Sequence, residues 1–239
     1  MTVFEILFLI VILLTNVIQA ITGFAGTVLA MPVSLRLVGS DVAKPVLNLA
    51  ALIICLAVVI HHFKDIQWKE FAKMILCVGS GFALGFAVQL LPINGTILLK
   101  LYGIVIMSIA LIYLFLDIDH VRIPTWVLYL CLFLGGLLHQ MYVSGGPLVV
   151  IYAMKTFKNK NSFRATLSLM WIVLNGFLFG THMASGLFSA HLWILVGIAF
   201  AVSSLSYIVG SILAKKLPHD IFMKITYVLL FISGISLIF

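Results

Sequence analysis

Charged residues are scarce in this chain. Asp, Glu, Lys and Arg make up 9% of the 239 residues, whereas hydrophobic residues make up 64% and the mean hydropathy is +1.27. A soluble domain of this length needs more polar groups to cover its surface, so the composition excludes a soluble protein. The long apolar runs also exclude an outer-membrane barrel, whose strands are short and alternate in polarity. We therefore predict an all-α polytopic membrane protein.

Cysteine is also rare, and the three that occur, Cys55, Cys77 and Cys131, are solitary. No CxxC or metal-ligand spacing is present, which argues against a disulfide framework and predicts neither a metal nor another cofactor. The sequence also lacks H-E-x-x-H, G-x-S-x-G, P-loop and dinucleotide-binding motifs. We therefore predict that the protein is not an enzyme and does not use ATP.

Acidic residues are almost absent from the hydrophobic segments, which leaves little from which to build a carboxylate site for a cation. The net charge of +7 comes from Lys and Arg in short connections, and the positive-inside rule explains this without a nucleic-acid partner. The segments instead offer N–H and O–H donors near glycine breaks, where helix N-termini attract negative charge. This balance favours a small anionic substrate in a protein surrounded by lipid.

Two of the hydrophobic segments are too long for one ordinary span. A membrane helix needs about 20 apolar residues, whereas the first and fifth segments run for about thirty. Glycines and polar residues interrupt both, so we expect each to be broken or re-entrant. The eight segments cover residues 4–35, 42–62, 71–91, 97–116, 125–154, 165–187, 192–214 and 221–239.

The breaks in these two segments supply most of the candidate binding groups. Unwound backbone at membrane depth is tolerated only where protein buries it or water reaches it. Close helix packing is the alternative explanation for the glycines, but it accounts poorly for the polar side chains among them. We predict that the substrate contacts Gln19, Thr22, Gly23, Gly26, His139, Gln140, Ser144, Gly145, Gly146 and Pro147.

The two long segments also indicate an internal duplication. A shift of 120 residues aligns Gly26 with Gly146 and Lys44 with Arg164. We predict two homologous transmembrane halves of one membrane domain, because transporters are often built from such repeats. The halves cover residues 1–116 and 125–239, and 117–124 is a polar connection. Small-residue matches at a shift of 125 pair Gly81 with Ser206 and Gly85 with Gly210.

The symmetry of the halves depends on the broken segments. Four full crossings per half make the halves parallel, whereas re-entrant hairpins leave an odd number of crossings and invert one half; both arrangements stay open. Counting every segment as one crossing puts most Lys and Arg on one face, which would be cytoplasmic, with both termini outside. This count places Lys64, Lys69 and Lys73 on the opposite face of the membrane from Lys215 and Lys216.

Four further residues are predicted to line the substrate path. Lys44 and Arg164 each open the second segment of a half, where they would draw anions from the inner face toward the break. Ordinary interface charges are the alternative. Asn48 and Ser168 lie one turn deeper on the same helix faces.

Two intramembrane histidines are the candidate proton carriers, because ionisable groups within spans are functional candidates by default. His139 lies beside the second break, and His182 lies near the outer end of the sixth segment, seven residues after Asn175. A simple interface position is the alternative for His182. His139 is the stronger candidate.

The motifs around the breaks resemble those of a known family. They are Gly23-Phe24-Ala25-Gly26 followed by Pro32, Ser144-Gly145-Gly146-Pro147, and Phe163-Arg164-Ala165-Thr166. Over nearly the whole chain, these motifs and the segment pattern are similar to the TauE/SafE family of sulfite exporter-like permeases. This resemblance implies a multi-pass protein of the bacterial inner membrane that moves sulfite, sulfoacetate or a related sulfur-containing anion.

We expect a secondary transporter that binds a small anion between the two broken helices and works by alternating access, with a proton as a candidate coupling ion. A channel-like pathway for anions or weak acids would use the same donors. A non-transporting membrane scaffold is the other alternative, in which the glycine motifs serve packing alone.

Overall fold

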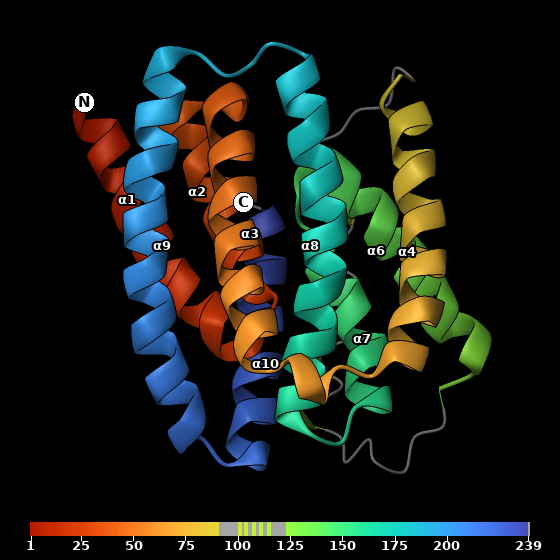
Figure 1. Ribbon diagram of the computed structural model, residues 1–239. Coiled ribbons are helices and arrows are strands. Elements are labelled where there is room, and N and C mark those ends of the chain that lie inside the picture. Colours follow the sequence, from red (N-terminus) through yellow and green to blue (C-terminus); the bar gives the residue numbers. More distant parts are fainter. Residues whose placement is uncertain are drawn as a thin grey trace.

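The computed structural model describes residues 1–90, ten positions between 100 and 115, and residues 123–238, and every regular element in these parts is a helix (Figure 1). The predicted all-α membrane architecture is therefore confirmed. The predicted segment 97–116 and connection 117–124 fall largely outside the described residues. Six helices are long and apolar enough to cross a membrane: α1 (Val3–Thr22), α3 (Ser40–His61), α4 (Trp68–Gln89), α6 (Thr125–Tyr142), α8 (Lys160–Ala184) and α9 (Ala190–Lys216).

Two shorter helices follow α1 and α6 directly. Helix α2 (Ala25–Val38) packs back against α1, and α7 (Gly146–Thr156) packs back against α6. The one-turn helix η1 (Phe63–Asp65) joins α3 to α4, and α10 (His219–Ile238) ends the described chain.

Both hairpins turn at a residue with left-handed backbone. Helix α1 ends at Gly23, whose φ is 86° and whose N–H donates to the Gln19 carbonyl at 2.7 Å. Helix α6 ends at Val143, whose φ is 55° and whose N–H donates to the His139 carbonyl at 2.8 Å. Each turn is thus a left-handed helix cap closed by one backbone hydrogen bond. Glycine adopts this conformation freely, whereas valine is strained in it.

The two hairpins open toward opposite ends of the bundle. Helix α3 runs between these ends, from the Gly39 end to the His62 end (Figure 1). The α1–α2 hairpin opens at the Gly39 end, where Glu5 near the start of α1 lies 2.6 Å from His191 at the start of α9. The α6–α7 hairpin opens at the His62 end, where α8 begins and α9 ends (Figure 1).

This path corrects the predicted distribution of basic residues. Helix η1 packs against α8, and the Gln67 N–H donates to the Thr166 hydroxyl at 3.1 Å. Lys64 and Lys69 therefore lie at the same end of the bundle as Lys215, not on the opposite face. The count was wrong because it treated each broken segment as one crossing, whereas each hairpin returns to its own side.

The long helices pack in pairs: α4 lies on α6, α9 lies on α1, and α3 lies on α8. Small residues make these approaches close. The Ser206 hydroxyl of α9 donates to the Leu13 carbonyl of α1 at 2.9 Å. In α4, Gly81 lies so close to the Phe133 carbonyl of α6 that any side chain would collide with it.

Candidate functional site

A small buried cavity lies where the two hairpin turns meet. It measures about 10 Å³, which is at the lower limit for one water molecule. Both turns contribute to it, and among the described residues that line it there is no carboxylate. The wall is formed by Gln19, Phe24, Thr27, Ala51, His139, Gly146, Trp171 and Asn175.

The first turn uses its own polar side chains to satisfy its backbone. The Gln19 side-chain oxygen accepts from the Gly26 N–H at 2.7 Å, and its amide nitrogen lies 3.9 Å from the Cys55 sulfur. The Thr22 hydroxyl accepts from the Phe24 N–H at 3.5 Å and from the next N–H at 3.4 Å. The predicted donors Gln19 and Thr22 thus bond to backbone N–H groups at the start of α2. Of these two residues, Gln19 lines the cavity and Thr22 does not.

The second turn leaves its helix start more open. Helix α7 begins at Gly146 and Pro147, and its N-cap residue, Gly145, has no side chain with which to cap the helix. Ser144 instead donates to the Tyr142 carbonyl at 2.9 Å. A Cβ added to Gly146 would lie 3.2 Å from the Phe24 carbonyl of the first turn. The two turns therefore touch, with Gly146 on the cavity wall.

His139 is held in this wall by polar contacts from α8. Its Nε2 lies 2.9 Å from the Asn175 side-chain oxygen, and its ring lies 4.7 Å from that of Trp171, centroid to centroid. Asn48 donates to the Asn175 carbonyl at 3.0 Å. His139 is 3% exposed, and its Nδ1 has no hydrogen-bond partner among the described residues. The cavity wall thus includes a histidine with one buried ring nitrogen that has no hydrogen-bond partner among the described residues.

Three other predicted residues do not line the cavity. Ser168 is fully buried in α8. Gln140, next to His139, points instead toward α4, where its amide donates to the Gln89 side-chain oxygen at 3.0 Å. Gly145 packs against the Gly135 carbonyl within its own hairpin.

Lys44 and Arg164 are bound to helix ends rather than to the central cavity. Lys44 of α3 donates to the Met141 carbonyl in the last turn of α6 at 3.1 Å. Arg164 of α8 donates to the Ala20 carbonyl in the last turn of α1. Each cation thus caps the C-terminal end of the broken helix in the opposite part of the chain, where the helix dipole is negative.

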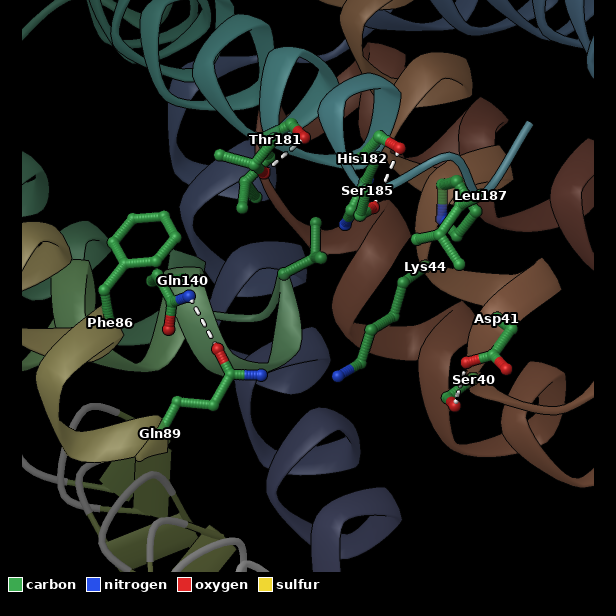
Figure 2. A pocket seen from close by; sticks show the side chains of 13 residues that line it. Ser40, Asp41, Lys44, Phe86, Gln89, Gln140, Thr181, His182, Ser185 and Leu187 are labelled. Atoms are coloured by element: carbon green, nitrogen blue, oxygen red, sulfur yellow. Dashed lines mark hydrogen bonds between the residues drawn. The ribbon is translucent and has the colours of Figure 1, made fainter. Parts of the chain in front are cut away.

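A vestibule of about 320 Å³ opens at the Gly39 end (Figure 2). Lys44 and His182 face it, together with Asp41. His182 therefore lies in this vestibule and not beside His139, so the two proposed proton carriers occupy different cavities. The other lining residues are Ser40, Pro45, Phe86, Gln89, Gln140, Val143, Leu178, Thr181, Ser185 and Leu187.

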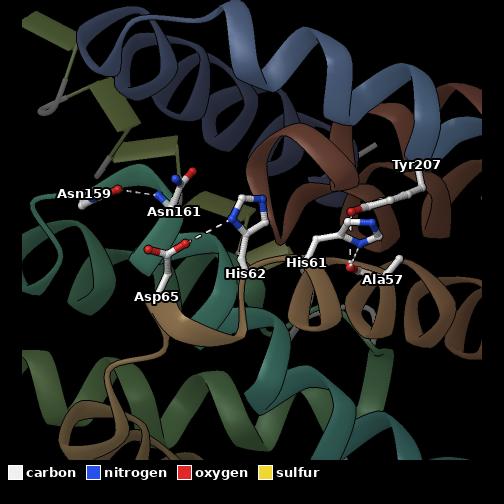
Figure 3. Close-up of polar contacts among 7 residues, drawn as sticks. All are labelled: Ala57, His61, His62, Asp65, Asn159, Asn161 and Tyr207. Carbon is white, nitrogen blue, oxygen red and sulfur yellow. Dashed lines mark hydrogen bonds and ion pairs between the residues drawn. The ribbon is translucent and has the colours of Figure 1, made fainter.

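A second vestibule, of about 420 Å³, opens at the His62 end. Figure 3 shows part of it: His61 and the Tyr207 hydroxyl both contact the Ala57 carbonyl, at 2.8 and 3.3 Å, and His62 pairs with Asp65 at 3.1 Å. The vestibule is lined by His61, His62, Lys160, Asn161, Arg164, Tyr207, Ser211, Ala214 and Lys215.

Sequence reasoning missed several of these residues. Trp171 and Thr27 line the cavity, and Tyr207, Lys160 and Lys215 line the second vestibule. Trp171 lies four residues before Asn175 and so shares its helix face, a signal that was present. The vestibule residues come from distant segments, and no local pattern joins them. No cluster of His, Cys, Asp or Glu suited to a metal occurs among the described residues.

The fold and the site define a polytopic helical membrane protein with a buried polar cavity between two broken helices, an arrangement found in membrane permeases. The chain belongs to the sulfite exporter TauE/SafE family, whose model matches residues 8–237. The resemblance seen in the motifs is thereby confirmed, and the protein is an integral multi-pass member of a transporter family. The chain matches no curated protein and no solved structure.

Proposed function

We propose that this protein is a secondary transporter that carries a small sulfur-containing anion, such as sulfite or sulfoacetate, by alternating access. The observation that carries the proposal is the central cavity, because both helix breaks form its wall and a separate vestibule lies toward each end of the bundle. A closed site between two vestibules is the arrangement that alternating access requires.

Two halves of inverted topology, residues 1–116 and 125–239, would supply the moving parts. Their hairpins open at opposite ends, and their contacts correspond. Ser206 lies on the Leu13 carbonyl of α1, and its counterpart Gly81 lies on the Phe133 carbonyl of α6. Gly81 and Ser206 are 125 residues apart, and Leu13 and Phe133 are 120 residues apart, which are the two shifts that the sequence suggested. The correspondence extends to the two vestibules, because Lys44 lines one and its counterpart Arg164 lines the other.

The chemistry of the cavity favours an anion. Gly146, the first residue of α7, lies on the cavity wall, and the positive end of the helix dipole at this helix start favours negative charge. Thr27 and Asn175 lie on the same wall, where the described lining residues include no Asp or Glu. In a low-dielectric site, such donors bind a negative charge more strongly than they would in water.

His139 offers a route to proton coupling. With the Asn175 oxygen as acceptor, His139 carries its proton on Nε2, so Nδ1 of the neutral ring is an acceptor. Protonation would turn Nδ1 into a second N–H donor and add a positive charge. An anion and a proton would then favour each other's binding, which is the thermodynamic basis of coupled transport.

The basic residues favour a cytoplasmic His62 end. Lys64, Lys69, Lys158, Lys215 and Lys216 lie in the short connections or helix ends at this side, and the positive-inside rule assigns such a side to the cytoplasm. The N-terminus would then lie outside the cell membrane.

The test is the uptake of radiolabelled sulfite into proteoliposomes that contain the purified protein, with sulfoacetate, thiosulfate, sulfate and chloride as competitors. Saturable uptake with counterflow, inhibited by a sulfur anion, is the expected result. Flux that does not saturate would indicate the channel-like alternative, and no flux with a folded protein would indicate the scaffold.

A pair of variants links uptake to the cavity. Thr27→Val removes a hydroxyl from the cavity wall, whereas Thr156→Val makes the same change in α7, where the hydroxyl donates to the Tyr152 carbonyl at 2.8 Å. Loss of one hydrogen bond of about 1 kcal/mol should raise the KM about fivefold in Thr27→Val alone. Equal effects of the two changes would contradict the central-site model.

A further inference from the structure

The two cations that cap the broken helices lie at the inner ends of the two vestibules. Arg164 lines the His62-side vestibule and donates to the Ala20 carbonyl of α1. Lys44 lines the Gly39-side vestibule and donates to the Met141 carbonyl of α6. Each cation is therefore positioned between a path from one end of the bundle and a hairpin that closes the central cavity.

We propose that Arg164 is an anion-binding latch: an anion that enters the His62-side vestibule binds its guanidinium group, releases the Ala20 carbonyl and opens the α1–α2 hairpin toward that vestibule. Lys44 is the corresponding latch at the Gly39 side. This inference rests on the proposed transport function and specifies how the substrate reaches and opens the central site.

The capping contacts are what hold each hairpin closed. The last carbonyls of a helix have no partner within the helix, and inside a membrane no water replaces one. A buried cation satisfies such a carbonyl and offsets the negative end of the helix dipole. When Arg164 moves away from Ala20, the end of α1 loses this partner, so the hairpin is less stable in its closed position.

Arg164 has the capacity to bind an anion in the vestibule. Its side chain is 3% exposed, and its Nε has no hydrogen-bond partner among the described residues. The oxygens of a sulfonate or sulfite group carry more negative charge than a carbonyl oxygen, and two of them accept parallel bonds from one guanidinium group. An anion at the inner end of the vestibule therefore competes effectively with the Ala20 carbonyl.

The charges of the two vestibules differ, which favours loading from the His62 side. Arg164, Lys160 and Lys215 line that vestibule without a carboxylate among the described lining residues, and Asp65 beside it is paired with His62. Lys160 is fixed in place, because it donates to the Leu217 carbonyl at 2.5 Å and to the Ala214 carbonyl at 3.0 Å. At the Gly39 side, Lys44 shares the vestibule with Asp41.

Labelling of Cys55 reports the opening of each hairpin. Cys55 is buried beside Gln19, so a thiol reagent reaches it only when a hairpin moves. With Cys77→Ser and Cys131→Ala, it is the sole thiol. A membrane-impermeant methanethiosulfonate is applied to right-side-out and inside-out vesicles, with and without sulfoacetate. Exposed positions at each end, Lys158→Cys and Ser185→Cys, calibrate which side the reagent reaches.

We expect sulfoacetate to accelerate labelling of Cys55 from the His62 side. Arg164→Gln should raise the anion-free rate from that side about tenfold or more, because a charge-assisted hydrogen bond is lost, and should abolish the response to sulfoacetate. Lys44→Gln should raise labelling from the Gly39 side only. Arg164→Lys keeps the charge and should retain the closed state.

The outcomes separate the latch from the transport function. Unchanged labelling in Arg164→Gln and Lys44→Gln, or equal increases from both sides, would overturn the latch even if the parent protein transports anions. If Arg164→Gln does not fold, Lys44→Gln and Arg164→Lys decide by the same criterion of sidedness. Absence of saturable uptake of every anion by the parent protein would overturn the transport function, whatever the labelling shows.

Discussion

At the scale of single residues, the two hairpin turns use different residue types for the same left-handed backbone conformation. Gly23 and Val143 both have left-handed backbone, with φ of 86° and 55°. Val143 is 1% exposed and packs in the core, so burial of its side chain offsets the strain of its backbone. Such strained positions occur where surrounding packing fixes them, and they cluster at sites that bind or switch.

Substitution of Gly23 tests the cost of this conformation. Gly23→Ala should lower the free energy of unfolding by about 1–2 kcal/mol, because a side chain is disfavoured in left-handed backbone. The matched control is Gly176→Ala in α8, where a Cβ would meet nothing within 4 Å and the backbone is helical. Thermal unfolding in detergent compares the two variants. A stability of Gly23→Ala equal to that of Gly176→Ala would contradict the prediction.

His139 tests the link between proton and anion at residue scale. His139→Gln retains an amide that reaches Asn175 but cannot be protonated, so anion uptake should persist while its stimulation by a pH gradient is lost. The measurement is uptake into proteoliposomes with and without an imposed pH gradient.

His182→Gln is the control for this experiment. His182 lies in the Gly39-side vestibule, away from the central cavity, so the response to the pH gradient should remain. If His182→Gln abolished the response and His139→Gln retained it, the proton would travel by another path than the one proposed.

At the scale of elements, small residues set how closely the helices approach. Gly81 of α4 lies against the Phe133 carbonyl of α6, and Gly136 of α6 lies against the Val78 carbonyl of α4. The adjacent Gly135 lies instead against the Gly145 carbonyl and Val149 of its own hairpin. Close backbone contact of this kind is a recognised driving force for helix association in membranes.

A comparison of two glycine substitutions in α4 distinguishes the effect of helix packing from that of helix propensity. Gly81→Ala should destabilise the protein by about 1–3 kcal/mol, because the new methyl group collides with the α6 backbone. Gly79→Ala, two residues away, meets nothing within 4 Å and should be neutral or stabilising by up to about 1 kcal/mol. Thermal unfolding of both variants in detergent makes the comparison, and equal stabilities would show that α4 and α6 do not pack as described.

At the scale of the whole molecule, the hairpins determine the topology. Because each hairpin returns to its own side, positions at the His62 end share one side of the membrane. Lys64→Cys and Lys158→Cys should therefore be labelled from one side and Ser185→Cys from the other, in a protein without its native cysteines. Impermeant maleimide applied to intact cells and to inverted vesicles provides the measurement. Labelling of Lys64→Cys from the same side as Ser185→Cys would contradict this topology and favour two parallel halves.

The sequence determined the class of the protein because composition and motif spacing are properties of the chain alone. Scarce charge and long apolar segments are enough to require a membrane, and the motifs around Gly23-Phe24-Ala25-Gly26 and Ser144-Gly145-Gly146-Pro147 are enough to indicate the family. In the structure, α1 ends at Gly23 and α7 begins at Gly146, whereas Pro32 lies inside α2.

Only the tertiary structure decided what the polar residues near the breaks contact. Gln19 and Thr22 turned out to satisfy the first turn, and Lys44 and Arg164 to cap helices from the other part of the chain. The partners of Gln19 and Thr22 lie within seven residues, but those of Lys44 and Arg164 lie 97 and 144 residues away. No local pattern predicts the distant partners, because they meet only when the helices pack. The direction of each hairpin likewise depends on packing, and with it the side of the membrane on which every basic connection lies.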